Sequence, residues 1–275
     1  MNEKDWIKVD LHIHTLDDPK DKIDYSAHQL LERARMLGFH VLAITLHDAV
    51  FDRAEVFADA AAMGILLIPA AEVRLQGADV VVLNVKPDEI ARLRSFDDLR
   101  KLRAERGASL FTFAPHPFYV LGASIGSRLI DEIDCFDGIE WCHFYKGWFN
   151  PNRRAERVAR KYGKRLLATS DAHQLDAFGS HFTSVLRPKI EAASRRLESE
   201  ARLEAASTLT PENVFAALRH GPIRLTSPPS SLMEIVNAFY FVFIKHPLKR
   251  RRASFMRGPT HPTNHPHDCD CARQS

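Results

Sequence analysis

Short apolar runs alternate with amphipathic segments of helical length over residues 1–230, and this alternation limits the possible folds more than any other feature. The helical segments include Ser26–Leu37, Arg53–Met63 and Asn152–Tyr162. Seven runs have the length and composition of strands: Lys8–Ile13, Val41–Thr45, Leu66–Ala70, Val80–Val85, Leu110–Ala114, Gly138–Trp141 and Leu166–Thr169. Repeated strand–helix units indicate a parallel sheet or a barrel. Seven strands favour the barrel, and a doubly wound sheet is the other fold that fits the pattern.

Residues at the ends of the predicted helices support these boundaries. Four helical segments end in a glycine just before the next strand, as a left-handed residue after a helix requires: Gly38, Gly64, Gly107 and Gly163. Thr210, Pro211 and Glu212 supply an N-cap, a first-turn proline and a first-turn acid, which predict a helix through Arg219. A short strand, Ile223–Thr226, closes the main domain, which we expect to span residues 1–230.

Residues 231–275 form a tail of different composition. Leu232–Ile244 is apolar with aromatics, and five Lys/Arg follow within residues 245–252. Thirteen residues are fewer than the roughly 20 that a membrane-spanning helix needs. We expect either peripheral membrane contact through residues 232–252, by an apolar face with a basic anchor, or docking onto the barrel or a partner. The Pro- and His-rich end is expected to be disordered, and the charged segment Pro188–Ala206 to be a solvated helix or an insertion.

Composition and charge narrow the classes of function. With 275 residues, 45% of them hydrophobic, the chain can bury a full core as one large domain. The net charge is +3, but the segment from Lys245 onward holds seven basic and two acidic side chains, which leaves −2 for the rest. That near-neutral charge argues against long nucleic acids as partners of the barrel. Four scattered cysteines and a polar N-terminus favour a reducing, cytoplasmic location.

Potential metal ligands follow five of the predicted strands at their carboxyl ends, which is where barrels place active sites. A lone histidine there is usually a surface or hydrogen-bonded residue, and a lone aspartate is usually an N-cap. Five such positions together are hard to reconcile with independent structural uses. Imidazole and carboxylate without thiolate suit catalytic Zn, Mn or Fe(II). The positions are Asp10–Thr15 with His12 and His14, Thr45–Asp48 with His47, Pro69–Glu72, Ala114–Phe118 with His116, and Ala168–His173 with Asp171 and His173.

These elements, in this order, resemble the PHP (polymerase and histidinol phosphatase) superfamily. The resemblance covers residues from about Lys8 to about Thr226: an HxHT element, a TxH element, a glutamate after the third strand, a PHP tripeptide and an SDAH element. It implies a distorted (β/α)7 barrel with a short helical, basic C-terminal tail. It also implies a site with two or three divalent metal ions (Mn, Zn or Fe) that hydrolyses phosphate esters. The stand-alone phosphoesterases of the family are a closer match than the domain attached to DNA polymerases.

The resemblance also assigns ligands. It places His12, His14, Glu72 and Asp171 on one metal. Glu72 bridges to a second metal that includes His116, and His47 and His173 hold a third. Three positions depart from the family pattern. Leu46 stands where an acid usually precedes the histidine, and Asp79 is the nearest polar residue where the family often has a histidine. The further ligand expected after HxH is one of four acids: Asp17, Asp18, Asp21 and Asp24.

Accessory roles are assigned by position alone. We expect His173 and His181 to act in catalysis, with His181 closely following the last motif. Arg74 and Arg128 are candidates for contacts with the substrate phosphate, and each equally fits a solvated charge. His143 is a second histidine that fits a place in the pocket wall.

The predicted function is hydrolysis of a phosphate ester, either a phosphomonoester or a short oligonucleotide, by a metal-activated water. Two other functions fit the same residues. One is an amidohydrolase-like reaction on a non-phosphate bond, because fold alone does not decide chemistry. The other is a degenerate PHP module that binds metal or ligand as a sensor, which Leu46 suggests.

Overall fold

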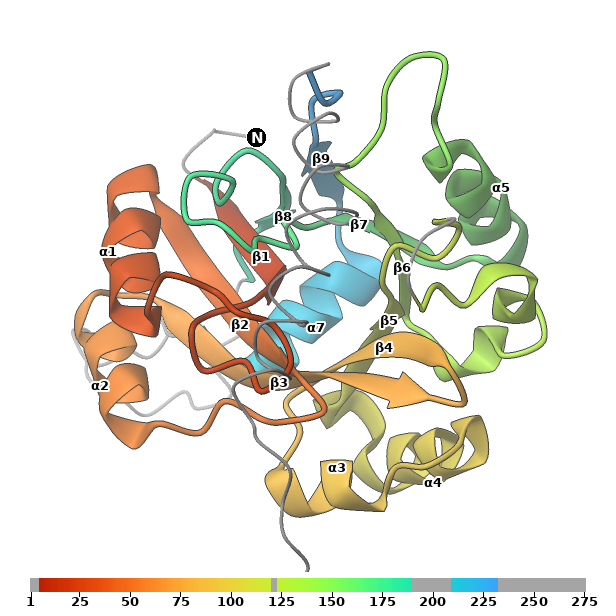
Figure 1. Cartoon of the computed structure of the whole chain (residues 1–275), viewed down its shortest axis with the longest axis horizontal. Coiled ribbons are helices and arrows are strands. Elements are labelled where there is room, and N and C mark those ends of the chain that lie inside the picture. The colour runs from red at the N-terminus through yellow and green to blue at the C-terminus, as the bar shows by residue number, and fades with distance from the viewer. Residues whose placement is uncertain (1–4, 120–122, 189–208, 232–275) are drawn as a thin grey trace, which may run out of the picture. The chain divides into compact units, whose positions relative to one another are not determined.

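The strands form one sheet in the order β7-β6-β5-β4-β3-β2-β1-β8-β9 (Figure 1). The structure, a computed structural model, describes residues 5–119, 123–188 and 209–231. Within these residues the strands are β1 (Trp6–Ile13), β2 (Phe39–His47), β3 (Leu66–Leu75), β4 (Ala78–Leu83), β5 (Phe111–Ala114), β6 (Gly138–Trp141), β7 (Arg165–Ala168), β8 (Phe182–Leu186) and β9 (Ile223–Thr226).

The two ends of this sheet come close to each other, so that it forms a nearly closed barrel. The backbone N–H of Ala168, at the end of β7, donates to Thr183 Oγ1 on β8, and that hydroxyl donates to the Ala168 carbonyl, both at 2.9 Å. A parallel bridge also joins Ile13 to Ala172. The predicted α/β barrel is confirmed, and the open doubly wound sheet is excluded.

Not every neighbouring pair of strands is parallel, as simple repeats would require. β3 and β4 form an antiparallel hairpin across Gln76 and Gly77, both with positive φ, and β4 also runs antiparallel to β5. β8 was not predicted; it runs antiparallel to both β1 and β9. The barrel is therefore distorted, and β4 lies directly beside β3 without an intervening helix.

Helices cover the outside of the sheet and close one end of the barrel. Ser26 caps α1 by accepting from the Gln29 N–H, and Gly38 ends it in the left-handed conformation with φ 70°. The described helices are α1 (Ala27–Leu37), α2 (Ala54–Ala62), α3 (Pro87–Arg92), α4 (Phe96–Arg106), α5 (Asn152–Tyr162) and α7 (Pro211–His220). Of these, α3 was not predicted, and α4 was predicted only by the glycine at its end, Gly107.

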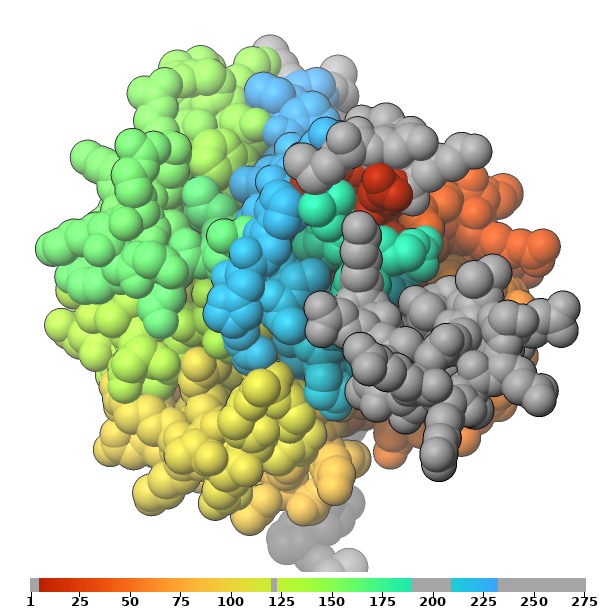
Figure 2. Space-filling view, turned by 180° about the vertical axis from the view of Figure 1, so that it is seen from behind, coloured from red at the N-terminus to blue at the C-terminus, as the bar shows by residue number. Residues whose placement is uncertain are grey.

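The barrel interior is an apolar core that α7 closes from below. Val214, Phe215 and Leu218 of α7 are fully buried against the inward-facing side chains of the strands. Burying each side chain of this size contributes roughly 1.5–3 kcal/mol. From behind, the blue segment of α7 and β9 runs through the middle of that face (Figure 2). With α7 at one end, the open end lies at the carboxyl ends of β1, β2 and β3.

The chain divides into two units, Met1–Pro229 and Ser230–Ser275. The predicted elements in 189–206 and 232–275 lie outside the described residues. In the part of the chain that the structure describes, no helix has the length and apolar character needed to cross a bilayer.

Candidate metal centre

The first ligand group comes from β1, where an irregularity aims two histidines into the barrel. Ile7, Val9 and Leu11 belong to the interior core, whereas Ile13 belongs to the outer cluster beneath α1 and α2. Between Asp10 and Ile13, β1 has one residue more than β2 has between Leu42 and Ile44. This bulge changes the alternation of the strand. His12 and His14 consequently point inward and are fully buried.

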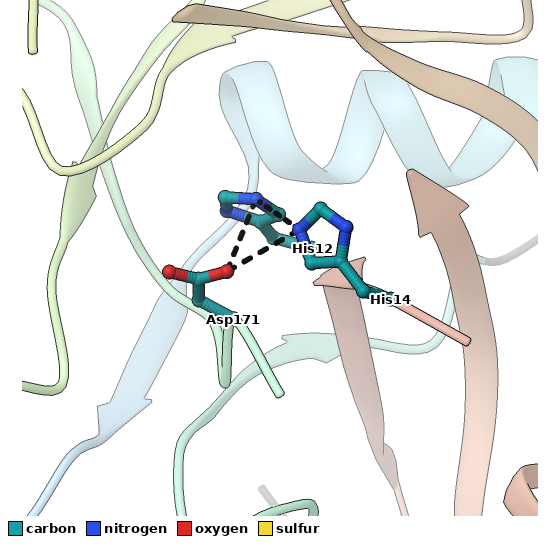
Figure 3. Close-up of side chains that lie close together, drawn as sticks. All are labelled: His12, His14 and Asp171. Carbon is teal, nitrogen blue, oxygen red and sulfur yellow. Dashed lines mark hydrogen bonds and ion pairs between the residues drawn. The ribbon is translucent and has the colours of Figure 1, made fainter. Parts of the chain in front are cut away.

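Asp171 completes this first group. Its Oδ1 lies 3.5 Å from His12 Nε2 and 3.4 Å from His14 Nε2, and the two nitrogens are 3.2 Å apart. Figure 3 shows the two imidazoles and the carboxylate converging on one point. Asp171 follows β7 in the left-handed region, with φ 46°, a conformation that is uncommon outside glycine and recurs at functional sites.

Glu72 on β3 joins this group to two others. It is 2% exposed. Its Oε2 lies 3.4 Å from Nε2 of His12 and of His14, and 3.2 Å from His47 Nε2. Its Oε1 lies 3.2 Å from His116 Nε2. One carboxylate therefore faces four imidazoles, with one oxygen toward three of them and the other toward the fourth.

The opposite ring nitrogens of three histidines face other carboxylates. Asp18 Oδ2 lies 3.1 Å from His14 Nδ1 and 2.9 Å from His47 Nδ1. Glu140 Oε1 lies 2.9 Å from His12 Nδ1. Each Nδ1 thus carries the ring proton and donates it, and each Nε2 presents a lone pair to the centre.

This donor set fits divalent metal ions. If the rings are neutral, lone pairs of neighbouring Nε2 atoms and carboxylate oxygens repel one another at 3.2–3.5 Å, and a cation among them replaces that repulsion with coordination. Imidazole and carboxylate without thiolate suit Mn, Zn or Fe(II). Three sets of residues each have their donor atoms within 4.8 Å of one another. They are His12, His14 and Asp171; His14, His47 and Glu72; and Glu72, Asp79 and His116.

The charges of the group are strongly coupled. Burial alone would raise the pKa of Glu72, but the neighbouring His12 and His116 hold it well below its usual range. Burial opposes protonation of His116, yet its hydrogen bond to Glu72 raises its pKa to about 9. The carboxylates of this cluster therefore favour positive charge beside them.

Comparisons of sequence and of fold both point to proteins of the PHP type. The family profile described as PHP-associated matches residues 149–222. A two-domain protein from Bacteroides vulgatus that contains a predicted PHP-like metal-dependent phosphoesterase shares the fold, with a TM-score of 0.52 and 17% identity over 86% of this chain and 69% of that one. The profile match and the shared fold agree with the resemblance of the five motifs to the PHP superfamily.

Two other solved structures share this fold. PsfC from Pseudomonas syringae has a TM-score of 0.57 and 16% identity over 89% of this chain and 99% of its own. The lesion-specific endonuclease PfuEndoQ from Pyrococcus furiosus has a TM-score of 0.50 and 11% identity over 86% and 66%. No curated protein matches the chain in sequence. At these identities the structural likenesses concern the PHP fold.

The structure separates the four acids that follow the HxH motif. Asp18 is buried and faces His14 and His47, and Asp21 Oδ2 lies 3.1 Å from His173 Nε2. Asp17 pairs with Arg53 at 2.7 Å, and Asp24 is exposed. Asp18 and Asp21 are therefore the two acids that reach the PHP histidines.

His173 lies at the edge of the centre. Its ring packs against that of His14, with centroids 4.5 Å apart. Its Nδ1 faces the Asp171 carbonyl at 3.0 Å, and its Nε2 faces Asp21. The structure groups His47 with His14 and Glu72 rather than with His173, so a third metal held by His47 and His173 stays a prediction.

Two of the three departures from the PHP pattern, Leu46 and Asp79, have structural explanations. Leu46 is 4% exposed and packs in the outer apolar cluster with Ile44, because alternate residues of β2 face away from the mouth. An apolar residue fits that position, and its neighbour His47 faces the centre. Asp79 lies with Glu72 and His116 and binds Arg74 through two guanidinium nitrogens.

The remaining predicted residues lie outside the three donor sets. Arg74 is two residues beyond Glu72 on the same face of β3 and so stands at the mouth. Arg128 donates to the Gln76 carbonyl at 2.9 Å, at the tip of the β3–β4 hairpin. His181 Nδ1 lies 2.9 Å from Ser227 Oγ, and its ring is 5.5 Å from that of His143. Their roles in catalysis and substrate binding stay predictions.

Sequence reasoning missed Glu140, which is 1% exposed and in contact with His12. A single acid inside an otherwise apolar strand, Gly138–Trp141, was the available signal. A buried acid without a partner is costly, so its presence in a core strand predicts a polar partner inside the barrel.

Proposed function

We propose that this chain hydrolyses a phosphate ester, a phosphomonoester or a short oligonucleotide, with two or three divalent metal ions held by the residues around Glu72. The observation that carries the proposal is the position of Glu72, whose two oxygens face two different sets of imidazoles. A carboxylate in this position suits a bridge between metal ions. The metal-dependent phosphoesterase named for the Bacteroides vulgatus relative supports the same chemistry.

Divalent metal ions held by these residues would lower the pKa of a bound water and neutralise the charge of phosphoryl oxygens. The chain contributes the arrangement. His12, His14 and Asp171 form one side of the centre, and Glu72 separates it from His116. The fully buried floor beneath, from α7 and the inward strand residues, excludes bulk water from below.

Substrate contacts are proposed at the rim. Arg74 has further N–H groups beyond the two that bind Asp79, so it can also donate to a phosphoryl oxygen at the mouth. His173 packs against His14, and His181 lies beside His143. We propose these two imidazoles as proton donors for the leaving oxygen.

A groove beside the centre offers space for the organic part of the ester. It has a volume of about 530 Å³ and lies between the β2–α2 loop, the end of β3 and α3. Asp48, next to His47, and Arg74 form its wall nearest the metal centre. Its other walls combine apolar side chains such as Ile90 with Arg94, a mixture that suits a small organic phosphate.

The proposal is tested by assaying protein purified with Mn²⁺ on a panel of phosphomonoesters and short oligonucleotides, with and without chelator. Phosphate release that the chelator abolishes, and that Glu72→Gln lacks, is the expected result. Metal binding with hydrolysis of amide substrates alone would replace the proposal with an amidohydrolase-like reaction. Metal binding without turnover of either class would favour a sensor.

We also propose that residues 232–252 make peripheral contact with a membrane. The proposed substrate is small and soluble, and not a long nucleic acid. Vesicle co-sedimentation of the full chain against a chain ending at Ser231 tests the first. Equal sedimentation of the two chains would contradict it. Catalysis should survive the truncation, because every residue of the metal centre lies before Pro188.

A further inference from the structure

Glu140 touches ligands of two different metal positions although it belongs to none of the three donor sets. It is the third residue of β6 and faces the barrel interior, 1% exposed. Its Oε1 accepts from His12 Nδ1 at 2.9 Å and from the Thr169 hydroxyl. Its Oε2 accepts from the backbone N–H of His116. One buried carboxylate thus receives three hydrogen bonds from β1, β7 and the loop after β5.

The contact with His12 determines which nitrogen of that ring faces the centre. A carboxylate opposite Nδ1 keeps the proton there, so Nε2 has its lone pair toward Glu72 and Asp171. Ring rotation would break the 2.9 Å hydrogen bond. Glu140 therefore sets both the tautomer and the orientation of His12.

The contact with His116 acts on the backbone. His116 has a positive φ of 29°. This conformation is uncommon for residues other than glycine, and more so for a residue that precedes a proline, as His116 precedes Pro117. Such strain persists only where the surroundings impose it. The N–H of His116 is held by Glu140, and its carbonyl accepts from the Ser124 hydroxyl at 2.6 Å. The direction of the His116 ring toward Glu72 thus depends on Glu140.

We propose that Glu140 is a positioning residue that sets metal affinity at both the His12 and the His116 positions. The inference rests on the metal-binding part of the proposed function and is independent of the substrate. Among the described residues Glu140 has no Lys or Arg ion pair, so its hydrogen bonds to the two ligand segments and Thr169 are its main compensation.

The test substitutes Glu140→Gln and measures metal binding without substrate. Glutamine offers one acceptor oxygen, so its NH₂ group must face either the His12 Nδ1–H or the His116 N–H, and one of these donors loses its partner. Loss of such an outer contact typically lowers metal affinity roughly 10–100-fold. Titration with Mn²⁺ or Zn²⁺ against a chromophoric chelator should show this loss, and the loss should include more than one metal per chain.

The matched control is Asp137→Asn, because Asp137 immediately precedes β6 and is also a largely buried carboxylate. It should lower the melting temperature and leave metal affinity within about twofold, since its partners are Arg103 and Arg219. Glu140→Asp is the second variant. It keeps the charge but is one methylene shorter, so it should retain one contact and give an intermediate affinity.

Wild-type metal affinity in a folded Glu140→Gln variant would overturn the proposal. Equal losses of metal affinity in Glu140→Gln and Asp137→Asn would also overturn it. If Glu140→Gln does not fold, full metal affinity in Glu140→Asp would overturn it. A wild-type chain that binds no metal would instead refute the proposed function itself. The two failures are therefore distinguishable.

Discussion

At the amino end of β6, Asp137 is bound by two arginines, whereas at the carboxyl end of β3 Glu72 is surrounded by imidazoles. Asp137 accepts from Arg103 of α4 at 2.7 Å and from Arg219 of α7 at 3.0 Å, and the Thr112 N–H adds a third bond. The chain supplies every cation that this end of the barrel needs. These bonds tie two helices to the sheet, so the group is structural.

At the other end, four carboxylates have no such partners among the described residues. Within the described ranges, Asp18, Glu72, Glu140 and Asp171 make ion pairs with histidines and none with Lys or Arg. Their charge is balanced only when the histidines are protonated or when a cation enters from solution. The partners of a buried carboxylate, more than its burial, therefore distinguish a structural ion pair from a metal site.

The largest expected effect is that of Glu72→Gln. The amide cannot bridge metals, so metal affinity should fall by more than the roughly 10–100-fold typical of outer contacts, and hydrolysis should disappear. Elemental analysis and the phosphate-release assay measure the two losses. Full metal content in this variant would mean that Glu72 is not a metal ligand.

The second test is Asp137→Asn at the opposite end. Removing one member of a buried ion pair should cost roughly 3–5 kcal/mol of unfolding free energy, because two arginines lose their charged partner. Urea unfolding measures the change, and metal content should not alter. An activity loss without a stability loss would contradict the division of roles.

The pH dependence of the metal-free protein sharpens the comparison. Carboxylate neighbours overcome burial and raise the pKa of His116 and of His173 to about 9, above the usual 6.5. Stability from these histidines is complete below about pH 6.5 and is lost as the pH rises toward 9. Each pKa unit corresponds to roughly 1.4 kcal/mol, an upper limit for coupled groups.

Unfolding in chelator should therefore become easier between pH 6.5 and 9. Added metal should remove most of this dependence, because it replaces the protons. The variant Asp137→Asn should show the same pH dependence as the wild type. Burial would raise the pKa of Asp137, but its arginine partners lower it, so the wild-type carboxylate stays charged over this range. A flat profile in chelator would refute the assigned pKa shifts.

The smallest expected effect separates the two arginines. Arg74→Ala should raise the KM for a phosphate ester about tenfold, the size expected for one charged hydrogen bond, with metal content unchanged. Arg128→Ala should have less effect, because Arg128 already binds the Gln76 carbonyl and packs on Phe96. A larger effect at Arg128 would place the substrate over the hairpin tip.

Much of the fold was predictable because it depends on local pattern. Apolar runs and helix-ending glycines located the strands to within a few residues, except for β8. β8 has only five residues, and the sequence between β7 and α7 has no strand–helix repeat that would indicate a strand there. α4 was indicated only by Gly107 at its end, because the helix is highly charged and only Phe96, Leu99 and Leu102 are buried.

The site was predictable where ligands sit in short motifs at strand ends. The bulge in β1 was not, because it depends on pairing with β2. The sequence also did not predict which of the four nearby acids faces the histidines, because the path of the loop after β1 determines that Asp18 does. Glu140 lies 128 residues from His12 in sequence, so only the closed order of the strands brings the two together.

The most direct test of the central claim is a metal count on wild-type protein. Protein purified with Mn²⁺, then dialysed free of unbound ion, should contain two or three divalent metals per chain by elemental analysis. A folded, monodisperse sample with fewer than about 0.2 metals per chain would contradict it, and the imidazoles around Glu72 would then be compensated by protons alone.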